Sequence, residues 1–248
     1  MNPQKTYPFS EHLIQKAESF PGVIAGIADP EELRESPSYR TFRTDNQHFS
    51  NDGRADSDEN WPEEIRAILV LGLSHPETNL KLDWWDGRGT QGNRELMAVS
   101  KTLKEWIANN SSITPQELPY HVEKGGIFLK DAAVLAGLGV IGKNNLLVTP
   151  RFGPRVRLRA IYLDTAIVGT GPVKDFVPCK NCDMPCQRAC PQNSFSSGGY
   201  RRKSCEIQMK KNFNDRVGAD NTGNFKKSDF FVKYCRACEM ACAVGKSA

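Results

Sequence analysis

The stretch Pro178–Pro191, with the sequence PCKNCDMPCQRACP, decides how the rest of this chain is interpreted. It holds four of the eight cysteines in the 248-residue sequence, and a lone Cys205 follows it. The last three cysteines form a second run, CRACEMAC, over residues 235–242. No cysteine precedes position 179. Thiols this dense, confined to one end of a chain, indicate a metal site and not a packed core.

The spacing of the cysteines predicts two four-iron, four-sulfur (4Fe-4S) clusters. The first run reads C-x2-C-x3-C-x3-C-P, one residue longer than the run of bacterial two-cluster ferredoxins, whose fourth cysteine crosses to the other cluster. The same crossing rule divides the eight cysteines into two sets of four, with none left over. The first set is Cys179, Cys182, Cys186 and Cys242. The second set is Cys190, Cys205, Cys235 and Cys238.

Two zinc sites are the main alternative, because zinc also binds paired C-x2-C motifs. The Cys190-Pro191 pair and the x3 spacings favour iron–sulfur clusters. Disulfides are disfavoured because the N-terminus lacks the apolar segment of a signal peptide, so we expect a cytoplasmic location. Basic residues among the ligands either tune the clusters and dock an acidic electron donor, or only solvate the surface. They are Lys180, Arg188, Lys233 and Arg236.

The remaining composition is that of an ordinary globular chain. A hydrophobic content of 39% supports a packed core, and a net charge of +4 is too small to indicate a nucleic-acid or membrane surface. No apolar run approaches the ~20 residues of a membrane span. Because two clusters need only a short module, the residues before it must have another role. We predict an α+β domain at residues 1–165 and a metal-bearing module at residues 166–248.

Hydrophobic periodicity predicts helices at 10–20, 93–109 and 127–136, and strands at 23–28, 65–73, 120–122, 146–149 and 156–163. The continuous apolar run at 65–73 indicates a central strand that is buried on both faces. We expect the last two strands to be joined by a turn around Pro150 and Pro154. The polar stretch 29–60 is expected to be a long loop, either a lid over a ligand or a solvated surface loop.

The segment Gly137–Gly142, with the sequence GLGVIG, brings three glycines into six positions. Glycine permits tight turns and a close approach of backbone to a ligand. The segment matches G-x-G-x-x-G, but a predicted helix precedes it and a predicted strand follows it. This is the reverse of the dinucleotide-binding context. The segment is not a P-loop either.

With its flanking residues, this segment reads AGLGVIGKNNLL over 136–147, and the two cysteine runs follow it. This order of motifs resembles the epoxyqueuosine reductase family and its wider relatives, the cobalamin-dependent reductive dehalogenases. The resemblance extends from about Val122 to Cys242. It implies a nitroreductase-like N-terminal domain that holds cobalamin, followed by a bacterial two-cluster ferredoxin-like module. It also implies that electrons pass through the clusters to cobalt, while a carboxylic acid donates a proton to the substrate.

The resemblance assigns site residues one by one. It places the proton donor at Glu123, where the family has Asp; the alternative is an ordinary surface glutamate. The turn beside the corrin corresponds to Ala136, Gly137, Leu138, Gly139, Gly142, Lys143, Asn144 and Leu147. Two departures stand out. The family's Tyr-x-Arg-Gly-x-Asp-Tyr-His stretch is not visible at Trp84–Asn93, and Cys242 is followed by Ala243 in place of proline.

Several other residues have both a functional and a structural interpretation. His75 and His121 are either metal ligands or structural histidines. Trp84 and Trp85 either form a wall beside a ligand or pack in the core. Four arginines along one strand and its turn either bind acidic groups or form a solvated sheet face: Arg151, Arg155, Arg157 and Arg159.

The sequence therefore predicts an iron–sulfur oxidoreductase that passes electrons through two 4Fe-4S clusters to a corrinoid, which reduces a small-molecule or nucleotide-like substrate. A low-potential donor such as ferredoxin or flavodoxin would supply the electrons. One alternative is an electron-transfer or corrinoid-activating protein without its own substrate. Another is a two-cluster protein whose upstream domain binds a flavin or nothing. We expect no membrane as a partner. A tRNA substrate is in doubt, because the helical-repeat extension of the tRNA-modifying enzyme has no counterpart here and the net charge is small.

Overall fold

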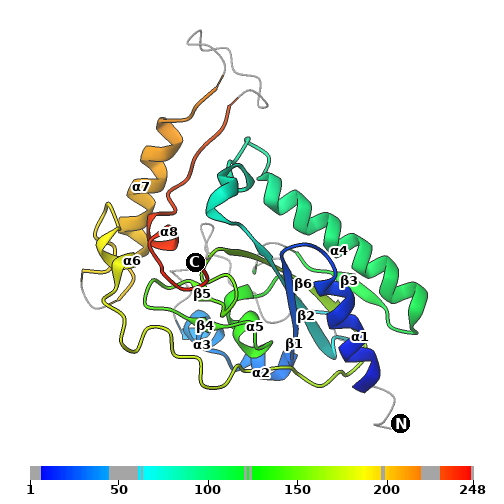
Figure 1. Ribbon diagram of the computed structural model, residues 1–248. Coiled ribbons are helices and arrows are strands. Elements are labelled where there is room, and N and C mark those ends of the chain that lie inside the picture. Colours follow the sequence, from blue (N-terminus) through cyan, green and yellow to red (C-terminus); the bar gives the residue numbers. More distant parts are fainter. Residues whose placement is uncertain are drawn as a thin grey trace. The chain divides into compact units, whose positions relative to one another are not determined.

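The computed structural model describes residues 7–44, 61–62, 64–119, 122, 125–196, 199–218 and 230–246. It contains a four-stranded sheet in the order β1-β2-β6-β3 (Figure 1). The strands are β1 (Val23–Ala28), β2 (Ala67–Ser74), β6 (Val156–Leu163) and β3 (Pro115–Glu117). Strand β1 pairs antiparallel with β2, with Val23 opposite Leu73, and β3 pairs antiparallel with β6. The fold is mixed α/β, whereas the nitroreductase-like and ferredoxin-like assignments stay predictions.

Strand β2 is the buried centre that the sequence predicts. All residues from Ala67 to Leu73 are buried, as is every residue of β1. A strand that is enclosed on both faces needs no polar alternation, so its apolar residues run without interruption.

Three longer helices were expected from periodicity, and all three are confirmed: α1 (Tyr7–Glu18), α4 (Gln91–Asn110) and α5 (Leu129–Leu135). Leu13 and Ala17 are fully buried, and α1 packs against β1. Helix α1 begins at Tyr7, so Ser10, the first residue of the predicted range, lies inside it.

The expectation of one long loop over 29–60 is wrong for its first half. This region forms two helices, α2 (Pro30–Arg34) and α3 (Pro37–Thr44). Asp29 caps α2, since its Oδ1 accepts hydrogen bonds from the backbone N–H groups of Glu31 and Glu32 at 2.7 and 3.2 Å. Proline is well suited to the first turn of a helix, where its missing N–H costs nothing. Residues 45–60 lie outside the described residues.

A second, two-stranded sheet pairs β4 (Val140–Ile141) with β5 (Leu147–Val148). The predicted strands at 146–149 and 156–163 are confirmed as β5 and β6, and β5 pairs with the preceding β4. A bridge between Thr149 and Gly153 closes the turn that follows. The strand predicted at 120–122 falls largely outside the described residues, and the edge strand of the larger sheet lies at 115–117.

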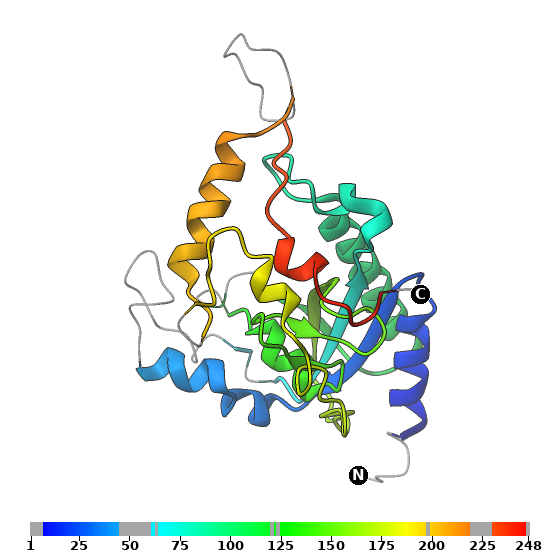
Figure 2. The same ribbon diagram turned by 60° about the vertical axis from the view of Figure 1, so that its left-hand side comes forward.

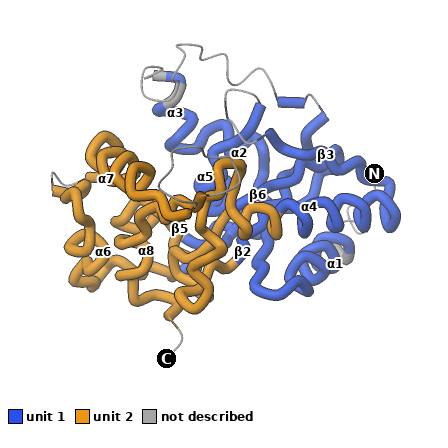
Figure 3. The backbone as a smooth tube through the Cα atoms, turned by 90° about the horizontal axis from the view of Figure 1, so that it is seen from above, with its two compact units in different colours: residues 1–73, 97–139, 158–175 blue, residues 74–96, 140–157, 176–248 orange. Residues whose placement is uncertain are grey.

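The chain divides into two compact units (Figure 3). The first comprises 1–73, 97–139 and 158–175, and the second comprises 74–96, 140–157 and 176–248. All eight cysteines belong to the second unit. Its helices include η3 (Glu77–Asp83), α6 (Pro185–Arg188), α7 (Arg202–Asn214) and α8 (Ala237–Met240), with α6 packed against α8 (Figure 2). The predicted boundary at 165/166 stays a prediction.

Within the part of the chain that the structure describes, no helix is long and apolar enough to cross a membrane.

Candidate functional site

The cysteines lie on short helices and turns of the second unit. Cys186 is in α6, Cys205 in α7 and Cys238 in α8. Cys186 is buried and the other seven are partly exposed. The sulfurs are therefore sheltered from bulk water without being sealed off from it.

The first predicted set of four gathers around Cys186. Burial raises the pKa of the Cys186 thiol, and the nearby Cys242, Cys182 and Cys179 thiols raise it further. Such an effect between like charges requires short distances. The structure thus brings Cys242 next to three cysteines of the first run, although it is far from them in sequence.

The second set gathers around Cys238. Burial, followed by the neighbouring Cys235, raises the pKa of the Cys238 thiol to about 12. Cys205 and Cys190 contribute to the same rise, and they also raise the pKa of Cys235, where burial is again the largest cause. Because the thiols oppose one another's ionisation, a bound cation is needed for all four to act as thiolates.

Cys190 differs from its three neighbours. Burial by itself would raise the pKa of its thiol. Hydrogen bonding from the turn at residues 192–194 outweighs burial, so the pKa lies below its ordinary value. The Ser194 nitrogen is 3.3 Å from the Cys190 Sγ atom. The turn after the first run therefore favours the thiolate form of Cys190.

The donors at this site are eight thiols, which zinc and iron–sulfur clusters can both bind. In the described residues, no three Cys, His, Asp or Glu side chains lie close enough together to hold one metal ion. A single zinc ion draws all four sulfurs to about 2.3 Å from one centre. A 4Fe-4S cluster binds each cysteine to a different iron, so its four sulfurs stand farther apart.

Arg236 anchors the second cysteine run. Its side chain is only 10% exposed and forms ion pairs with Asp83 and Glu239. Its Nη2 atom also donates a hydrogen bond to the backbone carbonyl of His75 at 2.9 Å. Arg236 therefore fixes the second run to segment 74–96 of the same unit, and its interpretation as a solvated surface residue is wrong.

Arg157 extends this network. Its Nη2 atom lies 2.7 Å from Asp83 and 3.1 Å from Glu239, while the fully buried His75 places Nδ1 2.9 Å from Asp83. Burial raises the pKa of Asp83, but the hydrogen bond with His75 and the charges of Arg157 and Arg236 outweigh it, so the pKa is lowered. Two arginines and two carboxylates thus form a nearly enclosed, charge-balanced cluster. We call it the Asp83 network.

Sequence reasoning missed the two carboxylates of the Asp83 network. Glu239 stands directly after the predicted ligand Cys238, and an acidic residue inside a ligand run was a usable signal. Asp83 carried no such signal, because its partners lie far along the chain. His75 is structural in this arrangement, as the simpler of its two interpretations had it.

Arg155 holds the backbone that carries Cys242. Its side chain is 4% exposed, and it donates hydrogen bonds to the carbonyls of Cys242, at 3.0 Å, and of Val244. In the first unit, Arg159 pairs with Glu117 at 2.9 Å. A solvated face is therefore wrong for Arg155, Arg157 and Arg159, which bind partners within their own units, whereas Arg151 is exposed.

The predicted corrin-binding turn is held by the chain's own packing at two of its glycines. Gly137 has a φ of 74°, and a Cβ there would lie 3.0 Å from the Gly171 Cα atom. A Cβ on Gly142 would lie 2.6 Å from Val148 Cγ2 and 3.6 Å from the Cys179 sulfur. Both positions require glycine whether or not a ligand is bound.

The other turn residues divide between buried and exposed positions. Ala136, Leu138, Asn144 and Leu147 are buried, and Asn144 accepts a hydrogen bond from the Leu146 N–H at 3.2 Å. Lys143 is exposed. Gly139 ends the part of the turn that belongs to the first unit.

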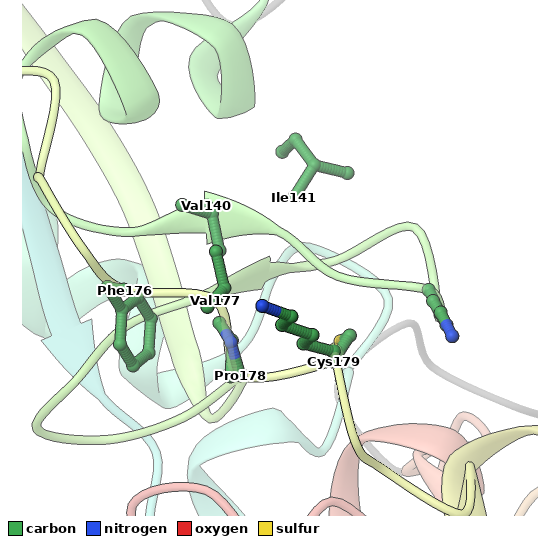
Figure 4. Close-up of a pocket in the computed structure, with 8 residues that line it drawn as sticks. Val140, Ile141, Phe176, Val177, Pro178 and Cys179 are labelled. Carbon is green, nitrogen blue, oxygen red and sulfur yellow. The ribbon is translucent and has the colours of Figure 1, made fainter.

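An apolar pocket of about 400 Å³ lies beside Cys179 (Figure 4). The turn contributes Val140, Ile141 and Lys143 to its lining, and residues 176–180 contribute the remainder. Lys143 is thus the one predicted corrin-binding residue that lines this pocket. A pocket with apolar walls and a few polar groups is the usual form of a small-molecule site.

Two predicted residues, Glu123 and His121, lie outside the described residues. Trp84 and Trp85 are half-buried, so neither belongs to the buried core that one interpretation predicted. The ring of Trp85 is 6.0 to 6.4 Å from three aromatic rings, those of Phe230, Tyr234 and Phe213.

No family model matches the chain. In sequence it is 41% identical to the tetrachloroethene reductive dehalogenase of Desulfitobacterium hafniense over 68 residues, which are 26% of this chain and 12% of that protein. It is 27% identical to that of Sulfurospirillum multivorans over 124 residues, covering 46% and 23%. It is 26% identical to the epoxyqueuosine reductase of Leadbetterella byssophila over 125 residues, covering 48% and 39%. Each match spans less than half of the relative.

Solved structures show a more extensive likeness. A selenomethionine-labelled epoxyqueuosine reductase superposes with a TM-score of 0.66 at 18% identity, over 98% of this chain and 67% of that one. An epoxyqueuosine reductase with an epoxyqueuosine-modified tRNA stem loop gives 0.64 at 17% identity, over 98% and 66%. The resemblance to the epoxyqueuosine reductase and reductive dehalogenase family is thus confirmed, as a shared fold with the former and partial sequence similarity to both.

Proposed function

We propose that this chain is an iron–sulfur oxidoreductase, similar to epoxyqueuosine reductase, that passes electrons through two 4Fe-4S clusters to a corrinoid, which reduces a bound substrate. The observation that carries the proposal is the gathering of eight thiols into two groups of four, around Cys186 and Cys238. The ferredoxin crossing rule is the basis on which we assign one cluster to each group. The fold shared with epoxyqueuosine reductase supports the same reading.

The chain's own residues would prepare both cluster sites. Cys179, Cys182, Cys186 and Cys242 would hold one cluster, and Cys190, Cys205, Cys235 and Cys238 the other. Arg155 fixes the backbone at Cys242, and Arg236 fixes the run that carries Cys235 and Cys238. Ligands that are held in place before the metal binds lose less conformational entropy on binding.

A corrinoid, when bound, would supply a strongly reducing cobalt centre. The turn fits such a group in part. Val140, Ile141 and Lys143 offer apolar surface and one ammonium group beside Cys179, which suits a flat macrocycle with acidic or amide side chains. We assign Gly137 and Gly142 the role of shaping the turn, since their contacts are with the chain itself.

Glu123 is our proposed proton donor, on the strength of the family resemblance. A carboxylic acid transfers its proton to the substrate as electrons arrive, which avoids a build-up of negative charge. The proposed partners are a low-potential donor such as ferredoxin or flavodoxin, and a small-molecule or nucleotide-like substrate.

Anaerobically reconstituted protein with added cobalamin tests this function. We expect about one equivalent of base-off cobalamin to bind, and no binding would refute the corrinoid. Lys143→Ala should weaken binding, while Lys203→Ala, at an exposed position on α7, should not. Glu123→Gln should abolish turnover and leave cobalamin binding intact. The substrates to offer are epoxyqueuosine nucleoside and a modified tRNA stem loop. Cobalamin reduction without turnover of either would favour the electron-transfer alternative.

A further inference from the structure

Helix α7 holds one cysteine of the second set on its inner side. The Asn212 Oδ1 atom accepts a hydrogen bond from the backbone N–H of Cys235 at 3.0 Å, so this side of the helix faces the second cysteine run. Cys205 lies on the same side as Asn212, because seven residues make about two helical turns. The inner side of α7 is therefore committed to the second cluster site.

The outer side of α7 is exposed and basic. Lys203, Ile207, Lys210 and Asn214 are all exposed, and their spacing of three and four residues places them on one side of the helix. We call these four residues the α7 face. Residues 201–217 contain six Lys or Arg and two Asp or Glu, so their net charge of +4 equals that of the whole chain. The excess positive charge of the protein is thus concentrated around this helix.

An apolar depression adjoins the C-terminal half of the α7 face. Its volume is about 400 Å³, and Tyr234, which directly precedes Cys235, forms part of its wall. The other lining residues are Met209, Lys210, Phe213 and Asn214. Ile207, which is 58% exposed, adds apolar surface on the same helix. Apolar side chains with a charged rim are the usual composition of a protein-binding surface.

We propose that the α7 face is the docking site of the electron donor, an acidic one-electron carrier protein, and that electrons enter the chain at the second cluster. This rests on the proposed binding of two clusters. Each encounter oxidises the donor by one electron and reduces the second cluster by one electron. No atom or proton is transferred.

Charge and distance both favour this entry point. A basic face attracts an acidic protein and speeds its association. A helix is about 10 Å across, so a donor on the outer side of α7 stands about one helix diameter from Cys205 on the inner side. The first set lies instead against the proposed corrin turn, because a Cβ on Gly142 would be 3.6 Å from the Cys179 sulfur. Electrons would therefore pass from the second cluster to the first and then to the corrinoid.

RNA also binds basic surfaces, through its phosphates. Ile207 and the apolar depression offer a phosphate no partner, whereas they can pack against side chains of a protein. The surface therefore fits an acidic protein better than a nucleic-acid backbone.

The test follows reduction of the reconstituted chain by the hydroquinone of a purified acidic flavodoxin, in an anaerobic stopped-flow instrument. Lys203→Glu combined with Lys210→Glu reverses the charge of the α7 face. Lys101→Glu combined with Lys174→Glu is the matched control, because it makes the same change in net charge at two exposed lysines of the first unit. Reduced methyl viologen is a small cation that needs no docking surface, so it measures the intrinsic reducibility of each chain.

At about 0.01 M salt, charges act over about 30 Å. We expect flavodoxin to reduce the α7 double variant at least about tenfold more slowly than the wild type, since steering by charge raises association rates by about 10- to 1,000-fold. The difference should shrink at about 1 M salt, where the screening length is about 3 Å. The control variant should stay within about threefold of the wild type. Methyl viologen should reduce both variants no more slowly than the wild type.

An unchanged rate in the α7 double variant, or an equal loss in the control, would overturn the inference and leave cluster binding standing. A wild type that holds both clusters but is not reduced by flavodoxin would do the same. Unchanged reduction together with weaker binding of a modified tRNA stem loop would assign the face to RNA and overturn the inference. A wild-type chain without iron would instead refute the proposed function.

Should the α7 double variant lose iron, Lys203→Gln combined with Lys210→Gln decides the matter at full iron content. Neutralisation removes half of the charge change, so a loss of at least about threefold supports docking at this face. An unchanged rate contradicts it.

Discussion

The Asp83 network makes a strong prediction about stability. Asp83→Asn keeps the size of the side chain and removes its charge. Asp83 is 11% exposed and lies 2.7 Å from Arg157 and 2.9 Å from His75, with Arg236 as a third partner. With Glu239, the network holds two negative and two positive groups. The substitution leaves it with one uncompensated positive charge in a nearly enclosed site.

The expected cost follows from burial. Removing one partner of a buried ion pair typically costs 3–5 kcal/mol, because the other charge stays desolvated, so we take about 3–5 kcal/mol as the range. Arg157 is 34% exposed, so water screens part of the remaining charge. We therefore expect the lower end of the range, about 3 kcal/mol, as the loss in the free energy of unfolding.

Urea denaturation of the reconstituted protein, followed by circular dichroism, measures this loss. The matched control is Asp86→Asn, three residues along the same segment. Asp86 pairs at 3.0 Å with Arg94, which is 53% exposed, so its loss should cost less than about 1 kcal/mol. Equal losses in the two variants would refute the reasoning from burial. Adding Arg157→Gln to Asp83→Asn restores neutrality, so the double variant should lose less than the sum of the single variants.

The stability difference between the wild type and Asp83→Asn should depend on pH. The pKa of Asp83 is lowered in the folded state, so its stabilising effect is complete above its unfolded pKa of about 3.9. The effect is lost as pH falls through the lower, folded pKa. The stability difference between the wild type and Asp83→Asn should therefore stay constant from neutral pH to about pH 5 and shrink below about pH 4.

Three further variants test separate contacts. Gly137→Ala should lower the free energy of unfolding of the cofactor-free protein by more than about 1 kcal/mol, because Gly137 has a positive φ that alanine adopts only with strain. If the substitution weakened cobalamin binding alone, Gly137 would not be needed for the packing of the turn. Gly142→Ala should lower the iron content of the first cluster, because the added Cβ would lie 2.6 Å from the Val148 side chain. Gly199→Ala is the control and should leave the iron content unchanged, because a Cβ there has no other atom within 4 Å. Arg155→Lys loses the hydrogen bonds to the carbonyls of Cys242 and Val244, so chelators should remove iron at least about tenfold faster. An unchanged rate would show that Arg155 does not hold this site.

The elements that could be predicted are those with a local signal. The unbroken apolar run of β2 and the helical periodicity of α4 can each be recognised within one short segment, and both elements are present as predicted. Helices α2 and α3 were missed because Pro30 and Pro37 mark a helix start as readily as a loop. The Asp29 cap was the local signal that decided between them.

The site followed the same rule. The two cysteine sets could be proposed because ligand spacing is local and the crossing rule supplies the long-range partner, and they stay a prediction. The Asp83 network could not be proposed, since Asp83, Arg157 and Glu239 meet only in the folded chain. The sequence predicted that Gly137 leaves room for a ligand. In the structure a glycine is needed there because the backbone of Gly171 lies close, and no local sequence pattern reveals that contact.

Iron content tests the central claim most directly. Two 4Fe-4S clusters predict about eight iron atoms per anaerobically reconstituted chain. Cys242→Ser should remove the first cluster and Cys238→Ser the second, each leaving about four iron atoms with a distinct paramagnetic spectrum. Two zinc atoms per chain without iron, or the same cluster lost in both variants, would contradict the account.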